Sequence, residues 1–211
     1  MHDQVKEYRI KVLSHIKSEL HNKRGKILDV GCGDCDDAAI FTNWGMSSYG
    51  IDVYRHKNAQ KILGNKFKKG SILKIPFNDN FFDFVYAKDV LHHIDEKQQR
   101  FTKHIVGIKE MKRVCKTGGK VIVLEANRYN PLFYPHMVLL NKHNHFTQSY
   151  FNMLMRTVFL KPRFIFFEAH VYPKKLKAIF KAYEKIMESI PILRYFLSYN
   201  LMIARIERYL L

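Results

Sequence analysis

The sequence predicts an α/β fold, with a parallel sheet that carries helices on both of its faces. Short apolar segments that read as strands alternate along the chain with segments of helical periodicity, and that alternation is typical of a parallel sheet. The first strand, at residues 26–30, runs directly into the glycine turn Gly31-Cys32-Gly33. The 211 residues carry no repeat and no low-complexity linker, so a single domain over residues 1–211 is expected.

The individual elements follow in the order that this fold requires. Apolar residues recur at helical spacing between Val5 and Leu20, so an N-terminal helix is expected within residues 1–24. Thr147 can cap a further helix over residues 150–160. Strands are expected at residues 26–30, 48–51, 66–69, 82–87, 120–125, 163–168 and 201–206.

A helical insertion is expected between the sixth and seventh strands, at residues 174–198. Its apolar residues form one helical stripe with the lysines largely outside it, and Pro191 ends or kinks the helix. The stripe comprises Leu176, Ile179, Phe180, Tyr183, Ile186, Met187 and Ile190. The preferred interpretation is a helix packed on its own core. The alternatives are a lid near the substrate edge and a basic amphipathic patch on a membrane surface.

The charge balance is strongly basic, with 36 Lys and Arg against 19 Asp and Glu and a formal net charge of +17. This charge indicates an anionic partner, either nucleic acid, an anionic membrane surface or a phosphorylated substrate, although solvated helix faces explain it equally well. No apolar run reaches the ~18 residues of a membrane span, and the first residues do not begin a signal peptide. A cytoplasmic location is therefore expected. If the anionic partner is a membrane surface, the protein is expected to be peripheral to that membrane.

A nucleoside-containing ligand is predicted at the carboxyl edge of the sheet. The glycine turn lets a ligand approach the backbone, and Asp52 at the end of the second strand can accept both hydroxyls of a ribose. A dinucleotide fingerprint is not met, because Asp36 stands where its third glycine belongs, and a P-loop is excluded because no Gly-Lys-Ser/Thr follows. The remaining pattern is D-x-G-x-G, which begins at Asp29.

Four segments together resemble the class I S-adenosylmethionine-dependent methyltransferases. They are ILDVGCGDC at residues 27–35, GSILKIPF at 70–77, FFDFVYAKDVLHHI at 81–94 and MKRVCKTGGKVIV at 111–123. The resemblance implies a seven-stranded, mostly parallel sheet in which the seventh strand runs antiparallel beside the sixth. It also implies S-adenosylmethionine as the cofactor and S-adenosylhomocysteine as its product.

The resemblance assigns cofactor binding to the carboxyl ends of the first four strands. Asp29 is expected near the amino acid end of the cofactor, and Asp52 at its ribose. The full set is Asp29, Gly31, Cys32, Gly33, Asp52, Val53, Ser71, Ile72, Ala87 and Lys88. In the methyltransferase motif that begins at Asp29, Cys35 replaces the third glycine. Ser71 replaces the acid that usually binds the adenine, so weaker cofactor binding is expected. A non-catalytic binding protein on the same fold is an alternative.

Cys32 and Cys35 form a C-x-x-C pattern in the glycine turn. A redox pair and half of a zinc site are the functional interpretations of this pattern. The preferred interpretation is two small side chains in a tight loop, because the chain lacks a second cysteine pair and a redox pair conflicts with a cofactor turn.

Methyl transfer needs an aligned acceptor and, for some acceptors, a base. His92 and His93, after the fourth strand, are the candidate bases, together with Asp89. His136, His143 and His145 are further candidates. A metal site is not expected among these last three, because no carboxylate ligand motif accompanies them.

The acceptor is expected near the end of the fifth strand, at Asn127, Arg128, Tyr129 and His145. Ala87-Lys88-Asp89-Val90 differs from the N-P-P-Y type of segment, which argues against DNA adenine methylation. The segment at residues 127–131 resembles methyltransferases whose acceptors are saccharides, lipids or other small molecules. The predicted function is O-methylation of a small-molecule, saccharide or lipid-linked acceptor, with RNA methylation as the alternative.

Overall fold

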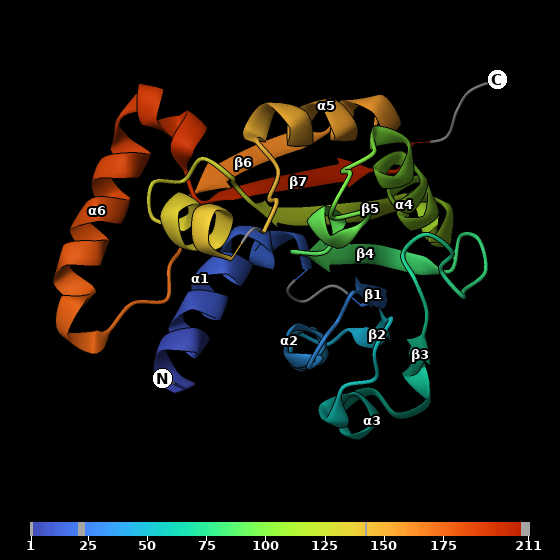
Figure 1. Ribbon diagram of the computed structural model, residues 1–211. Helices are drawn as coiled ribbons and strands as arrows, with labels where there is room; N and C mark the ends of the chain where they lie inside the picture. The colour runs from blue at the N-terminus through green and yellow to red at the C-terminus, as the bar shows by residue number, and fades with distance from the viewer. Residues whose placement is uncertain (1, 21–23, 142, 208–211) are drawn as a thin grey trace.

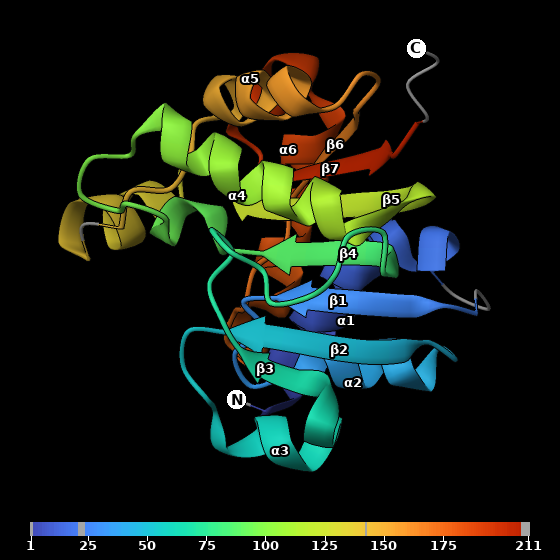
Figure 2. The ribbon, with the colours of Figure 1, turned by 90° about the vertical axis from the view of Figure 1, so that its right-hand side faces the viewer.

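The computed structural model describes residues 2–20, 24–141 and 143–207. Its centre is a seven-stranded sheet in the order β3-β2-β1-β4-β5-β7-β6 (Figure 2). The strands are β1 (Lys26–Val30), β2 (Ser47–Asp52), β3 (Phe67–Lys69), β4 (Phe82–Lys88), β5 (Cys115–Ala126), β6 (Arg163–Phe167) and β7 (Tyr199–Arg205). Strand β7 lies between β5 and β6 and runs antiparallel to both. The predicted seven-stranded, mostly parallel sheet is confirmed.

Helices cover both faces of this sheet (Figures 1 and 2). They are α1 (His2–Leu20), α2 (Asp36–Asn43), α3 (Lys57–Leu63), α4 (Phe101–Val114), α5 (Gln148–Val158) and α6 (Lys177–Ser189). Helices α4 and α5 lie on one face, and α1 and α2 on the other. The predicted cap of α5 is present, since the Thr147 side chain accepts a hydrogen bond from the Tyr150 amide.

The central strands are buried on both faces because their side chains alternate between two cores. Along β4, Val85 and Ala87 belong to the core under α4 and α5. Phe84 and Tyr86, which alternate with them, belong to the core under α1. This alternation follows from the two-residue period of a strand. Strands β1, β2, β4 and β5 run parallel to one another, so their carboxyl ends lie at a single edge of the sheet, where the loops can form a site.

Helix α6 sits outside α1 rather than on the sheet (Figure 1). It is held there by Lys11, whose Nζ lies 2.6 Å from Glu184 Oε2, and it buries Met187. Ile179 and Ile186 are 65% and 54% exposed. The interpretation of α6 as a helix packed on its own core is therefore wrong for most of the stripe. The helix ends at Ser189, just before Pro191, as the proline predicts.

No described helix combines the length and apolar character needed to cross a membrane.

Candidate active site

The glycine turn after β1 is built against the end of β2. The amides of Gly31 and Cys32 both donate to the carbonyl oxygen of Ile51, at 2.8 and 3.0 Å. Gly31 has a φ of +69°, and a Cβ there would lie 2.4 Å from Val90 Cγ2. Glycine adopts this positive φ readily, and it lacks the side chain that would overlap Val90.

Asp52 closes this turn and lines a cavity. Its Oδ2 accepts from the Gly33 amide and its Oδ1 from the Tyr54 amide, both at 2.9 Å. The cavity has a volume of about 590 Å³. Five of the predicted cofactor-binding residues line it, namely Gly31, Asp52, Val53, Ser71 and Ile72. We call it the donor cavity.

The other five predicted cofactor residues, Asp29, Cys32, Gly33, Ala87 and Lys88, do not line the donor cavity. Asp29 is buried, and its burial raises its pKa, as does the charge of Asp37, whereas Lys88 acts to lower it. Lys88 Nζ lies 2.7 Å from Asp37 Oδ2. The prediction that Asp29 and Lys88 line the cofactor site is therefore not met in the donor cavity.

Cys32 and Cys35 are buried free thiols whose sulfur atoms lie 3.1 Å apart. Cys35 stands at the position that the resemblance assigns to a third glycine, and it has a φ of +62°. That left-handed conformation costs a non-glycine residue free energy, so the substitution has left the backbone of the turn in the shape that glycine favours.

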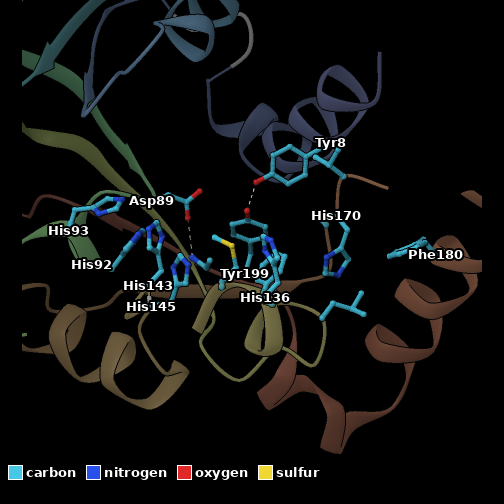
Figure 3. A pocket seen from close by; sticks show the side chains of 16 residues that line it. Tyr8, Asp89, His92, His93, His136, His143, His145, His170, Phe180 and Tyr199 are labelled. Carbon is cyan, nitrogen blue, oxygen red and sulfur yellow. Dashed lines mark hydrogen bonds between the residues drawn. The ribbon is translucent and has the colours of Figure 1, made fainter. Parts of the chain in front are cut away.

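Figure 3 shows a second cavity, which has a volume of about 630 Å³. We call it the histidine cavity, because six histidines line it: His92, His93, His136, His143, His145 and His170. Apolar side chains complete much of its wall, including Leu132, Phe133, Met137 and Phe180. Asp89 and His93 line both cavities, so the two meet at the carboxyl end of β4.

His92 is fixed by a carboxylate in the interior. Glu125 Oε2 lies 2.6 Å from His92 Nδ1, and Glu125 Oε1 accepts from the amides of Val90 and Leu91 at 2.9 and 2.6 Å. Burial alone would lower the pKa of His92, but the charge and hydrogen bond of Glu125 outweigh it and the pKa is raised. For His145, burial and the charge of His92 lower the pKa to about 4.

Asp89 lies where the cavities meet. Its φ is +53°, and its Oδ1 accepts from the Ala126 amide at 3.1 Å. Burial, together with the charge of Glu125, raises its pKa to about 6. Asp89 is therefore a carboxylate poised to exchange a proton close to neutral pH.

The far end of the histidine cavity holds residues that sequence reasoning missed. His170 Nε2 lies 2.5 Å from the buried carboxylate of Glu168, and the Tyr8 and Tyr199 hydroxyls are hydrogen bonded. The E-x-H pattern directly after the sixth strand could have indicated the first pair. Nothing in the sequence pairs Tyr8 with Tyr199, because they are 191 residues apart.

Of the four predicted acceptor residues, the structure brings His145 to the cavity. Asn127 is buried, and its Nδ2 donates to the carbonyl oxygens of Tyr195 and Leu197, both at 2.9 Å. Arg128 donates to Asn144 Oδ1 at 3.0 Å, and Tyr129 is 51% exposed. None of these last three lines the cavity.

The histidines group differently from the sequence expectation. Among the described residues, the ligand atoms that lie within 4.8 Å of one another belong to His92, His143 and His145. His136 lines the same cavity but is not in this group.

Comparison with known proteins agrees with this site. Residues 28–123 match the family model described as a methyltransferase domain. The chain has the fold of the class I S-adenosylmethionine-dependent methyltransferases.

Individual relatives match this chain in part. An uncharacterized methyltransferase of Schizosaccharomyces pombe is 31% identical over 129 residues, which cover 54% of this chain and 44% of that protein. A demethylmenaquinone methyltransferase of Geobacillus is 35% identical over 117 residues, which cover 50% and 47%. The chain thus spans somewhat less than half the length of these curated relatives.

A solved structure extends the likeness of fold to most of the chain. Geranyl diphosphate C-methyltransferase from Streptomyces coelicolor was solved with Mg²⁺, geranyl diphosphate and S-adenosylhomocysteine. It superposes with a TM-score of 0.63 at 12% identity, covering 93% of this chain and 80% of that one.

S-adenosylmethionine, the cofactor of methyltransferases with this fold, fits the donor cavity. Asp52 presents its carboxylate at the wall, where it can accept hydrogen bonds from ribose hydroxyls. Gly31 presents no side chain, and the volume of about 590 Å³ is within the range of small-molecule sites. Ser71 also lines the cavity, although its hydroxyl accepts a hydrogen bond from the Leu73 amide at 3.2 Å.

Proposed function

We propose that this methyltransferase acts on a hydroxyl oxygen of a small, largely apolar acceptor, free or lipid-linked, in the histidine cavity. The observation that carries the proposal is the meeting of the two cavities at Asp89 and His93. An acceptor in the histidine cavity would reach the donor cavity at that point. Catalysis of methyl transfer depends largely on such alignment.

The chemistry is divided between cofactor and protein. S-adenosylmethionine, when bound, supplies a methyl group on an electrophilic sulfonium. Asp52 would hold the ribose, and Asp89 would accept the proton of the acceptor hydroxyl. His93 is the other candidate for that role, because it also lines both cavities. His92 is less suited, since it lines the histidine cavity but not the donor cavity.

The wall of the histidine cavity supports an apolar acceptor over a saccharide. Leu132, Phe133, Met137 and Phe180 offer contact area to rings and hydrocarbon chains rather than hydrogen bonds to several hydroxyls. The names of two similar proteins, a demethylmenaquinone methyltransferase and a geranyl diphosphate C-methyltransferase, agree with an acceptor of that class.

Helix α6 supports a membrane surface as one source of the acceptor. Ile179 and Ile186 are exposed on a helix that also carries Lys177, Lys181 and Lys185. This combination is typical of helices that lie on anionic lipid. We therefore include peripheral attachment at a cytoplasmic membrane face in the proposal. The net charge of +17 keeps RNA as the second candidate acceptor.

The test is transfer of labelled methyl from S-adenosylmethionine to three fractions of a cell extract: organic-soluble metabolites, water-soluble metabolites and RNA. The proposal expects label in the organic fraction, in a product whose new methyl group is an ether or ester by mass spectrometry and NMR. Label in RNA would replace the proposal with the second candidate. Cofactor binding without label in any fraction would favour a non-catalytic binding protein.

A further inference from the structure

Three histidines converge on one side of the histidine cavity (Figure 3). The ring centroids of His92 and His145 are 4.4 Å apart, and that of His143 lies 6.5 Å from His92 and 6.0 Å from His145. One ring nitrogen from each lies within 4.8 Å of the others. In a tetrahedral zinc site the nitrogens are about 3.4 Å apart, so modest side-chain rotation would complete the geometry.

His92 and His145 both have a ring nitrogen that can bind a metal. Both ring nitrogens of His145 lack a hydrogen-bond partner among the described residues, although the side chain is only 5% exposed. Such an orphaned buried imidazole costs free energy unless something binds it. His92 uses Nδ1 toward Glu125, which leaves its Nε2 for the cavity.

The surroundings have the form of a metal site. Glu125 is fully buried and holds His92 by the carboxylate–imidazole contact that orients histidine ligands in metalloproteins. His143 and His145 flank Asn144, whose side chain bonds to Arg128 and to the Glu96 carbonyl oxygen. The His143 amide donates to the Met137 carbonyl oxygen at 2.9 Å. The two loop histidines are thereby placed opposite His92.

We propose that His92, His143 and His145 bind a zinc ion, with Glu125 as the hydrogen-bond partner that orients His92. Three histidine ligands leave the fourth tetrahedral position open, as in catalytic zinc sites. That position would face the histidine cavity, where a water molecule would complete the site. Binding of an acceptor oxygen there is an extension that rests on the proposed function, whereas zinc binding itself does not.

The test uses untagged protein that has been freed of metal with a chelator. Zinc chloride is titrated in competition with a chromophoric zinc chelator, and cobalt chloride is added in parallel while visible absorption is recorded. The expected result is one zinc per chain and the cobalt spectrum of a four-coordinate site. Substoichiometric zinc binding by the parent protein would overturn the proposal.

Matched variants locate the site. His143→Ala and His145→Ala should each weaken zinc binding by more than about 100-fold, since loss of a ligand costs more than loss of its hydrogen-bond partner. Glu125→Gln should weaken it about 10- to 100-fold. His136→Ala is the control, because His136 lines the cavity outside the group, and it should stay within about 2-fold of the parent.

Equal weakening by His136→Ala and His145→Ala would mean that zinc binds elsewhere in the cavity, and would also overturn the proposal. Circular dichroism and binding of S-adenosylhomocysteine check that each variant is folded. His143 is partly exposed, so His143→Ala carries the test if a variant of buried His145 does not fold. All of these readouts are independent of methyl transfer, so failure of the zinc site and failure of the proposed function are distinguishable.

Discussion

Glu125 Oε2 lies 2.6 Å from His92 Nδ1, in a part of the molecule where both side chains are buried. Because Glu125 is the last residue but one of β5 and His92 follows β4, this contact joins the ends of two neighbouring strands. The other oxygen of Glu125 accepts hydrogen bonds from the amides of Val90 and Leu91. The described hydrogen bonds of the carboxylate thus all go to residues of the turn after β4. That turn carries the residues at which the two cavities meet.

Asp52→Ala should weaken S-adenosylhomocysteine binding about 10- to 100-fold by calorimetry. Hydrogen bonds to a charged group contribute about 1.5–3 kcal/mol, and each 1.4 kcal/mol is a factor of about ten. Asp79→Ala is the control, because Asp79 lies on the surface beside Arg113, away from the donor cavity. Equal affinities of the parent and Asp52→Ala would show that Asp52 does not bind the ribose.

Asp89→Asn should lower the rate of methyl transfer about 10²- to 10⁴-fold, the range for loss of a general base. Cofactor affinity should change little, which separates a role in proton transfer from one in binding. The measurement is single-turnover methylation together with calorimetry, with Asp79→Asn as the control carboxylate. An unchanged rate would move the assignment to His93.

Gly31→Ala should lower the free energy of unfolding by about 2–5 kcal/mol in urea. The positive φ contributes about 1–2 kcal/mol, and the overlap with Val90 about 1–3 kcal/mol. Gly33→Ala is the matched control: its φ is +50°, but among the described residues a Cβ meets nothing within 4 Å. It should lose only about 1 kcal/mol. If both variants lose the same amount, the overlap with Val90 contributes nothing.

The stability difference between the parent and His104→Gln should shrink as the pH falls from 7.5 to 5.5. His104 is buried, with Nε2 bonded to the Ile94 carbonyl oxygen and Nδ1 to the Tyr150 hydroxyl, and burial lowers its pKa. The unfolded chain therefore takes up a proton first, at a pH of about 6.5, and the parent loses stability as the pH falls through that value. Urea unfolding at both pH values measures this, and a constant difference contradicts it.

Met187→Ala and Ile186→Ala test how α6 is attached. Met187 is 5% exposed, so its truncation should cost about 2–5 kcal/mol. Its neighbour Ile186 is 54% exposed, and truncation there should cost less than about 1 kcal/mol. Similar losses in urea unfolding would mean that the whole apolar stripe is buried.

The sequence by itself determined the sheet, the resemblance to S-adenosylmethionine-dependent methyltransferases and five of the residues that line the donor cavity. Strand periodicity and the spacing of Asp29, the glycine turn and Asp52 depend on local backbone geometry, which neighbouring residues dictate. The same local logic placed the cap at Thr147 and the helix end before Pro191. Local geometry does not show which side of a turn each residue faces. The sequence therefore predicted cofactor binding for both Lys88 and Gly31, although only Gly31 lines the donor cavity.

Only the tertiary structure decided which histidines lie together and which side chains of α6 are exposed. His92 meets His143 and His145 because the loop after β5 folds back over the turn after β4, and that approach depends on packing between distant segments. The exposure of Ile186 beside buried Met187 was equally invisible, since an apolar stripe records the amphipathic pattern but not the surface that covers it. Local sequence sets backbone geometry, whereas long-range packing selects which side chains share a cavity.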